Sequence, residues 1–177
     1  IGARDATGGD FSGFLGALGR QPRDPGLHDA WERAAYVDWA CTVSPCGQLA
    51  RPSMFMSKHW MDQLWSWDHC FNALALAGGH DALAWDQWQA PFDHQDAFGA
   101  IPDGLNDVFK HYNFCKPPVH GWTARELLAR CRRRPGKRRL AEIRSHLERH
   151  TRWFLDHRRA PGQRLPHYLH GNDSGWD

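Results

Sequence analysis

The apolar residues of segment 60–76 recur at helical spacing, and this pattern restricts the fold more than any other feature of the chain. The positions follow i, i+4, i+7, i+11 and i+14, which is one face of an α-helix. They are Trp60, Leu64, Trp67, Phe71 and Leu74. Two glycines at 78–79 then supply a helix stop. The sequence therefore predicts a helix across this segment that buries the apolar stripe.

The rest of the chain repeats the alternation of helical segments and long loops. Further helices are expected at about 29–43, 80–90, 121–131 and 140–157. The loop at 91–119 is rich in proline and glycine, and loops of that length inside a compact domain are usually functional. No segment alternates as a strand does, so we expect an all-α fold. The side chains expected to be buried include Trp60, Phe71, Leu74, Leu147 and Phe154.

Length and composition restrict the class of protein. The 177 residues suit one domain or part of a larger one, and a hydrophobic content of 41% is enough for a core. No apolar run approaches the ~20 residues that cross a bilayer, and no signal peptide is evident. The five cysteines are irregularly spaced without a C-x-x-C pair. This indicates reduced thiols, neither a zinc knuckle nor a disulfide framework, and a cytoplasmic protein.

Ten tryptophans exceed what core packing normally uses. Clustered aromatic rings can bind sugars, whose C–H faces stack on them, or unpaired bases. Residues 1–124 hold most of the tryptophans and carry a net charge of −6, whereas residues 125–159 carry +9. A nucleic-acid groove interleaves rings and cations, so this separation counts against nucleic acid. A helical domain that binds carbohydrate without catalysis, or single-stranded nucleic acid, remains an alternative.

Two other patterns have simpler interpretations. The arginine run at 130–139 is interrupted by Pro135 and Gly136, which favours a solvated basic turn between two helices. His146 and His150 are four residues apart on a predicted helix, but Leu147 stands where a zinc protease needs glutamate. We find no third ligand and expect no metal.

Two internal motifs combine aromatic rings or glycines with carboxylates. In WSWD at 65–68, Trp65 and Asp68 lie three residues apart, so an indole can stack on a sugar while a carboxylate accepts hydrogen bonds from its hydroxyls. Alternatively, Trp65 packs in the core and Asp68 caps a helix or faces solvent. The segment QDAFGAIPDGLND at 95–107 is rich in amides and carboxylates, and an ordinary polar loop has the same composition.

The final segment, HGNDSGWD at 170–177, is too rich in glycine and short polar residues for a helix. It predicts a shaped loop that presents Asp177 beside Trp176. A glycosidase needs one carboxylic acid to protonate the leaving oxygen and a second carboxylate as base or nucleophile. An apolar neighbour such as Trp176 can raise the pKa of the acid into a useful range. A surface turn whose indole packs back onto the body is the alternative.

Taken in order, four segments resemble the (α/α)6-barrel glycosidases of glycoside hydrolase family 63. They are MSKHWMDQLWSWDHCFNALAL, HQDAFGAIPD, KPPVHGW and GNDSGWD. The family includes processing α-glucosidases and mannosylglycerate hydrolases, and the resemblance runs from about residue 26 to the end. It implies a partial (α/α)6 toroid made of the first few helical hairpins. Residues 1–25 then form a loop-rich lead-in, and residues 26–177 the N-terminal portion of the catalytic domain.

The resemblance also implies a site. Asp177 matches the general acid of an inverting hydrolase that acts on α-glucosides or α-mannosides. The positions that match substrate-binding elements are Trp65, Trp67, Asp68, Gln95, Lys116, Trp122, Gly175 and Trp176. No cofactor, metal, nucleic acid or membrane is implied, and the expected partner is a carbohydrate substrate.

In proteins of this family the base is a glutamate that comes much later than the acid. The resemblance therefore implies a chain truncated at the acid loop, which needs the remainder of its own catalytic domain. We expect such a fragment to be inactive alone, because an acid without an activated water assists half of the displacement.

Overall fold

A computed structural model describes residues 11–19, 21–57 and 59–176, and about half of this part is helical. The α-helices of the described part are α1 (Phe11–Leu18), α2 (His28–Cys41), α3 (Asp68–Leu76), α4 (Asp81–Gln89), α5 (His120–Arg130) and α6 (Lys137–His157). Three short 3-10 helices accompany them: η1 (Pro25–Leu27), η2 (Ala90–His94) and η3 (Gly171–Ser174). No described helix is both long and apolar enough to span a bilayer. The mainly helical fold is confirmed.

Two small antiparallel sheets were not expected. β1 (Thr42–Val43) pairs with β2 (Ser53–Met54), and β4 (Gly104–Leu105) lies between β3 (Leu64–Trp65) and β5 (Lys110–His111). In the second sheet Trp65 is opposite Gly104, which is in turn opposite His111. Strands of two residues are too short to show alternation in a sequence, so the expectation of a strand-free chain was wrong.

The β3 strand also corrects the predicted helix at 60–76. Because Leu64 and Trp65 pair with β4, the helix begins at Asp68. Trp60 therefore lies outside it and is 77% exposed, while Phe71 is on its outer face and 45% exposed. The prediction that these two side chains are buried was wrong. Phe154 is buried as expected, and Leu74 and Leu147 are half-buried.

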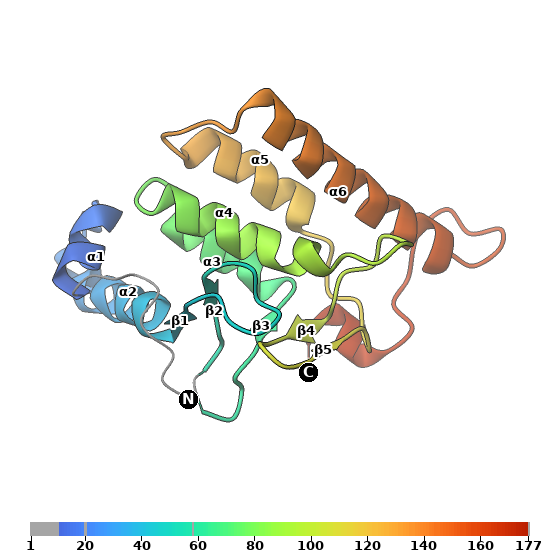
Figure 1. Cartoon of the computed structure of the whole chain (residues 1–177), viewed down its shortest axis with the longest axis horizontal. Helices are drawn as coiled ribbons and strands as arrows, with labels where there is room; N and C mark the ends of the chain where they lie inside the picture. The colour runs from blue at the N-terminus through green and yellow to red at the C-terminus, as the bar shows by residue number, and fades with distance from the viewer. Residues whose placement is uncertain (1–10, 20, 58, 177) are drawn as a thin grey trace.

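The main core lies among α3, α4 and α5, with α6 on the outer side of α5 and the α1–α2 pair at the opposite end (Figure 1). Trp88 is its largest fully buried side chain, and the indole Nε1 donates to the carbonyl of His120 at 3.0 Å. A smaller core beneath the sheets includes Val43, Leu64 and Leu105. The second core holds the β3–β4–β5 sheet against the helices, beside the C-terminal segment (Figure 1).

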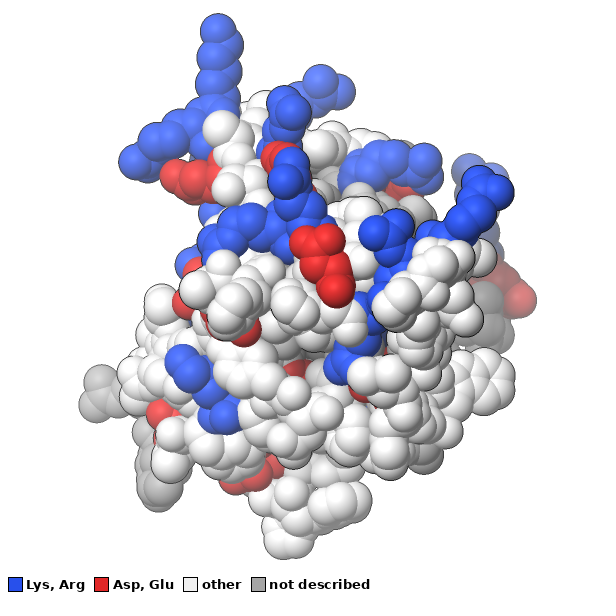
Figure 2. Space-filling model, turned by 90° about the vertical axis from the view of Figure 1, so that its right-hand side faces the viewer, with Lys and Arg blue, Asp and Glu red and all other residues white. Residues whose placement is uncertain are grey.

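The basic run joins α5 to α6, as its proline and glycine predicted. Asp81 at the start of α4 holds this connection, because its carboxylate accepts hydrogen bonds from the backbone of Arg132 and Arg133 at 2.6 and 3.3 Å. On the face seen in Figure 2, Lys and Arg side chains gather over the upper part, at the height of α5 and α6. Several pair with glutamates on the same helices, for example Arg152 with Glu148 at 2.8 Å.

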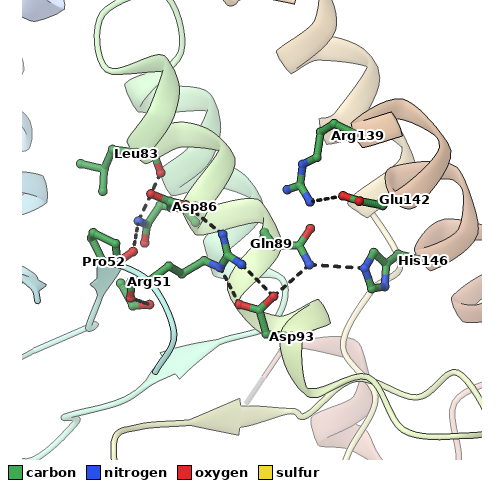
Figure 3. A network of polar contacts seen from close by, with 11 residues as sticks. Arg51, Pro52, Leu83, Asp86, Gln89, Asp93, Arg139, Glu142 and His146 are labelled. Carbon is green, nitrogen blue, oxygen red and sulfur yellow. Dashed lines mark hydrogen bonds and ion pairs between the residues drawn. The ribbon is translucent and has the colours of Figure 1, made fainter. Parts of the chain in front are cut away.

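A polar network ties the loop before β2 to α4, η2 and α6 (Figure 3). Arg51 binds Asp86 at 3.0 Å through Nη1 and binds both carboxylate oxygens of Asp93 through Nε and Nη2. Gln89 donates to Asp93 at 3.1 Å and lies 3.4 Å from the ring of His146. A guanidinium group that binds both oxygens of one carboxylate makes the strong form of this contact. The network therefore holds the loop before β2 against α4 and η2.

Candidate functional site

A hollow of about 230 Å³ opens where β3 ends and α3 begins. It is lined by Met56, Met61, Trp65, Trp67, Asp68, Lys116 and Gly175. Five of these residues are among the nine predicted for the site. The hollow brings together segments that are more than a hundred residues apart in the sequence.

The WSWD motif supplies the wall of this hollow because it is the turn from strand to helix. Trp65 is the last residue of β3, Trp67 is the N-cap of α3 and Asp68 begins the helix. Ser66 is buried between them, with its N–H donating to the carbonyl of Asp103 and its own carbonyl 3.0 Å from His120 Nε2. The hydrogen bonds of Ser66 thus hold the motif in place. The carboxylate of Asp68, in the first turn of α3, is also stabilised by the helix dipole.

Lys116 is a buried cation at the edge of the hollow and is 6% exposed. Its Nζ donates to the carbonyl of Asn172 at 2.8 Å and lies 3.8 Å from the carboxylate of Asp103. The same atom is 5.6 Å from the ring centroid of Trp65, within the range of a cation–π contact. Lys116 therefore joins the tryptophan wall to the C-terminal loop.

The C-terminal loop is organised by Asp173, which is 1% exposed. Its Oδ1 accepts from the N–H of Cys115 at 2.8 Å, and its Oδ2 accepts from the N–H groups of Leu169 and His170 at 2.9 and 3.1 Å. Burial by itself raises the pKa of Asp173, but these N–H donors and Arg158 outweigh it, so the net pKa is lowered. Asp173 is therefore an anion that shapes the loop.

Gly175 packs flat against the indole of Trp67. The glycine has φ 73°, and a Cβ placed on it would lie 2.5 Å from Cζ2 and 2.8 Å from Cε2 of that ring. Both the backbone conformation and the close approach require glycine at this position. Gly175 thus has a structural role at the edge of the hollow, and its predicted role in substrate binding stays a prediction.

Of the other four predicted residues, three are described by the structure, and none of these three lines the hollow. Gln95 donates to the carbonyls of Gly99 and His146, which joins its loop to α6. Trp122, at the start of α5, is 43% exposed and contacts the ring of Phe71. Trp176 is 90% exposed, and Asp177 lies outside the described residues. Roles for these four in substrate binding or catalysis stay predictions.

Several residues of the site were not predicted from the sequence. Met56 and Met61 line the hollow from the loop before β3, and their types give no signal. Asp103 and Asp173 are buried carboxylates, of which the first lies 3.8 Å from Lys116 and the second holds the C-terminal loop. Asp173 is the third residue of η3 and forms a reciprocal cap with His170, but H-x-x-D is not the usual signature of such a cap, so the sequence gives no signal for it.

The described residues include no group of three or more His, Cys, Asp or Glu side chains placed to hold a metal ion. His146 and His150 are instead part of a packed ring cluster. His150 is 5.1 Å from His120 and 5.2 Å from Phe154, centroid to centroid. Burial lowers the pKa of His150 to about 4 and that of His120 to about 3.

No curated protein matches this chain. The family model of the mannosylglycerate hydrolase MGH1-like glycoside hydrolase domain matches residues 61–177. That range includes every residue predicted for the site and all but Met56 of the lining of the hollow. The chain therefore belongs to the family of mannosylglycerate hydrolase MGH1-like glycoside hydrolase domains.

Proposed function

We propose that the hollow between β3, α3 and the C-terminal loop binds the non-reducing sugar of an α-glucoside or α-mannoside, and that Asp177 protonates the departing oxygen. Membership of a glycoside hydrolase family supports the class of reaction. The observation that carries the proposal is the position of Gly175, two residues before Asp177, against the indole of Trp67. The loop that precedes Asp177 in the sequence therefore lies at the edge of the hollow.

The lining suits a sugar. Trp65 and Trp67 offer faces on which the C–H groups of a pyranose can stack, and Asp68 offers acceptors for its hydroxyls. Lys116 adds a positive charge that is held in place by Asp103. A site in which apolar surface surrounds a few fixed polar groups is typical for small ligands. Losing these residues is expected to reduce binding and transition-state stabilisation together.

The proposed mechanism is hydrolysis with inversion at the anomeric carbon. Asp177 gives its proton to the leaving oxygen while a second carboxylate activates a water on the opposite face of the sugar. The two carboxyl groups are then about 6.5–9.5 Å apart, which leaves room for that water. The resemblance assigns the base to a glutamate C-terminal to Asp177, and for that reason we propose that the 177-residue chain is inactive alone.

The central experiment replaces Asp177 by Asn in the complete gene product. Turnover of an unactivated glycoside is expected to fall about 10²–10⁴-fold, the usual contribution of general acid catalysis. A glycosyl fluoride is expected to be hydrolysed at a rate much closer to wild type, because fluoride departs without protonation. Asp156→Asn is the matched control, since Asp156 is exposed on α6. Near wild-type turnover of the unactivated glycoside by the Asp177 variant refutes the assignment.

Three further measurements test the stereochemistry, the role of Asp68 and the alternative function. The anomeric configuration of the first product, followed by NMR, distinguishes inversion from retention. Asp68→Asn is expected to raise KM and lower kcat, whereas Asp156→Asn is expected to change neither. Gel retardation with oligosaccharides and with single-stranded nucleic acid addresses the alternative of a binding domain, and retention by nucleic acid alone argues against a sugar site.

A further inference from the structure

The buried carboxylate of Asp173 ties the C-terminal loop to the rest of the molecule. One of its oxygens accepts from Cys115, in the segment that precedes α5, and the other accepts from two N–H groups of the loop itself. Next to it, Lys116 donates to the carbonyl of Asn172 at 2.8 Å. Two consecutive loop residues are therefore held by two consecutive residues of another segment.

Hydrogen bonds continue from Asp173 toward the end of the loop. The hydroxyl of Ser174 donates to the carbonyl of Gly171 at 2.6 Å and accepts from the N–H of Trp176 at 3.2 Å. The N–H of Gly175 donates to the carbonyl of Asn172 at 3.3 Å. Each residue from Asp173 to Trp176 thus makes at least one hydrogen bond that restrains the loop, and Asp177 is the next residue in the sequence.

We propose that Asp173 is the positioning residue for the acid of this site: its carboxylate sets the backbone course of residues 169–176, and thereby the direction from which Asp177 approaches the bound sugar. The inference rests on the proposed role of Asp177. Asp173 contacts no substrate and carries no proton in the reaction. It acts through the loop, and Lys116 supplies the second tie.

The change Asp173→Asn is a sharp test because the three donors occupy both oxygens. The amide keeps the shape of the carboxylate but replaces one oxygen by an NH₂ group. With one orientation the NH₂ meets the N–H of Cys115, and with the other it meets the N–H groups of Leu169 and His170. Either orientation brings donors together, so the loop must shift.

A shift of this kind harms proton donation most. A displacement of the order of 1 Å in a catalytic group can cost about 10²-fold in rate. We therefore expect Asp173→Asn to lower kcat about 10²-fold on an unactivated glycoside and less than about tenfold on the glycosyl fluoride. A purely structural loss of active protein lowers both rates by the same factor, and that result overturns the proposal.

The double variant separates this proposal from the proposed function. If Asp173 acts through Asp177, adding Asp173→Asn to Asp177→Asn causes no further loss on the unactivated glycoside. A further fall of about 10²-fold in the double variant shows an independent role and overturns the positioning proposal. Should Asp177→Asn by itself keep wild-type turnover, the proposed function fails, and this outcome is distinct.

A second variant covers a failure of Asp173→Asn to fold. Ser174→Ala removes the next link toward Trp176 and leaves the buried carboxylate intact. We expect a smaller loss, about tenfold, again confined to the unactivated glycoside. Asp156→Asn remains the control for an Asp-to-Asn change, with both rates as in the wild type. Equal effects of Ser174→Ala on the two substrates contradict the proposal.

Discussion

Replacing Gly175 by alanine tests the contact on which the candidate site depends. In the structure Gly175 has φ 73°, and a methyl group there would lie 2.5 Å from Cζ2 of Trp67. Carbon atoms pack at about 3.5–4.0 Å, so the overlap is about 1 Å or more. The neighbour is a rigid ring that itself packs against Phe71 at 5.7 Å. Either the loop or the indole has to move.

Two costs determine the size of the effect. The left-handed conformation costs a residue with a Cβ about 1–2 kcal/mol relative to glycine. Forcing an extra methyl group into a packed contact typically costs about 1–3 kcal/mol. We therefore expect Gly175→Ala to lower the free energy of unfolding by about 2–5 kcal/mol, if the loop stays on Trp67. If the loop instead moves away from Trp67, the free energy of unfolding falls by less, but the hollow opens.

Urea denaturation followed by tryptophan fluorescence measures the first outcome, and the KM for the glycoside measures the second. Gly171→Ala is the matched control in the same loop, because no atom lies within 4 Å of a Cβ built there. Its effect on the free energy of unfolding is expected to stay below about 1 kcal/mol. Equal stability and equal KM for the two variants would refute the contact between Gly175 and Trp67.

Three other properties can be tested directly. Burial lowers the pKa of His150 to about 4, so the free energy of unfolding is expected to fall as the pH drops from about 6.5 toward 4. This residue contributes at most about 1.4 kcal/mol per pH unit. In acid denaturation, His150→Phe should make the free energy of unfolding depend less steeply on pH. Thiol labelling at pH 8 should modify the exposed Cys46 well before Cys70, whose pKa burial raises to about 12; equal rates contradict the burial. Arg51→Ala should lower the free energy of unfolding in urea by about 1–3 kcal/mol, since two carboxylates lose their cation. Arg152→Ala, at an exposed position, should lower it by less than about 1 kcal/mol. Equal losses for the two variants argue against the network of Figure 3.

Helices with clear stop signals could be predicted from the sequence. The segments predicted at 80–90 and 121–131 are α4 at Asp81–Gln89 and α5 at His120–Arg130. Glycine or proline bounds these helices, and their apolar faces are long enough to show the period. The start of α3 could not be predicted, because Leu64, which belongs to the apparent helical stripe, lies with Trp65 in a two-residue strand. Pairing with Gly104 and Leu105 depends on residues about forty positions away, which no local pattern records.

The site shows the same limit. Trp65, Trp67 and Asp68 are adjacent in the sequence, so a motif was enough to find them. Lys116 and Gly175 came from the resemblance, and neither residue type in isolation indicates a site. Their actual contacts, with Asn172 and Trp67, join segments that only the folded chain brings together. Gln95 was also predicted from the resemblance, and no sequence pattern indicates its hydrogen bonds to Gly99 and His146, which hold the start of its loop on α6.

The last loop carries two carboxylates in the sequence NDSGWD, and the structure gives a physical reason why Asp173 is not the acid. A general acid must hold its proton near neutral pH, which requires a raised pKa. Burial by itself raises the pKa of Asp173, but three backbone N–H groups and Arg158 stabilise the anion and lower the net pKa. Asp173 is thus unsuited to donate a proton, although only 1% of it is exposed and burial favours the protonated form. In the proposed mechanism the acid is therefore Asp177, and the proposed task of Asp173 is to hold the loop in place.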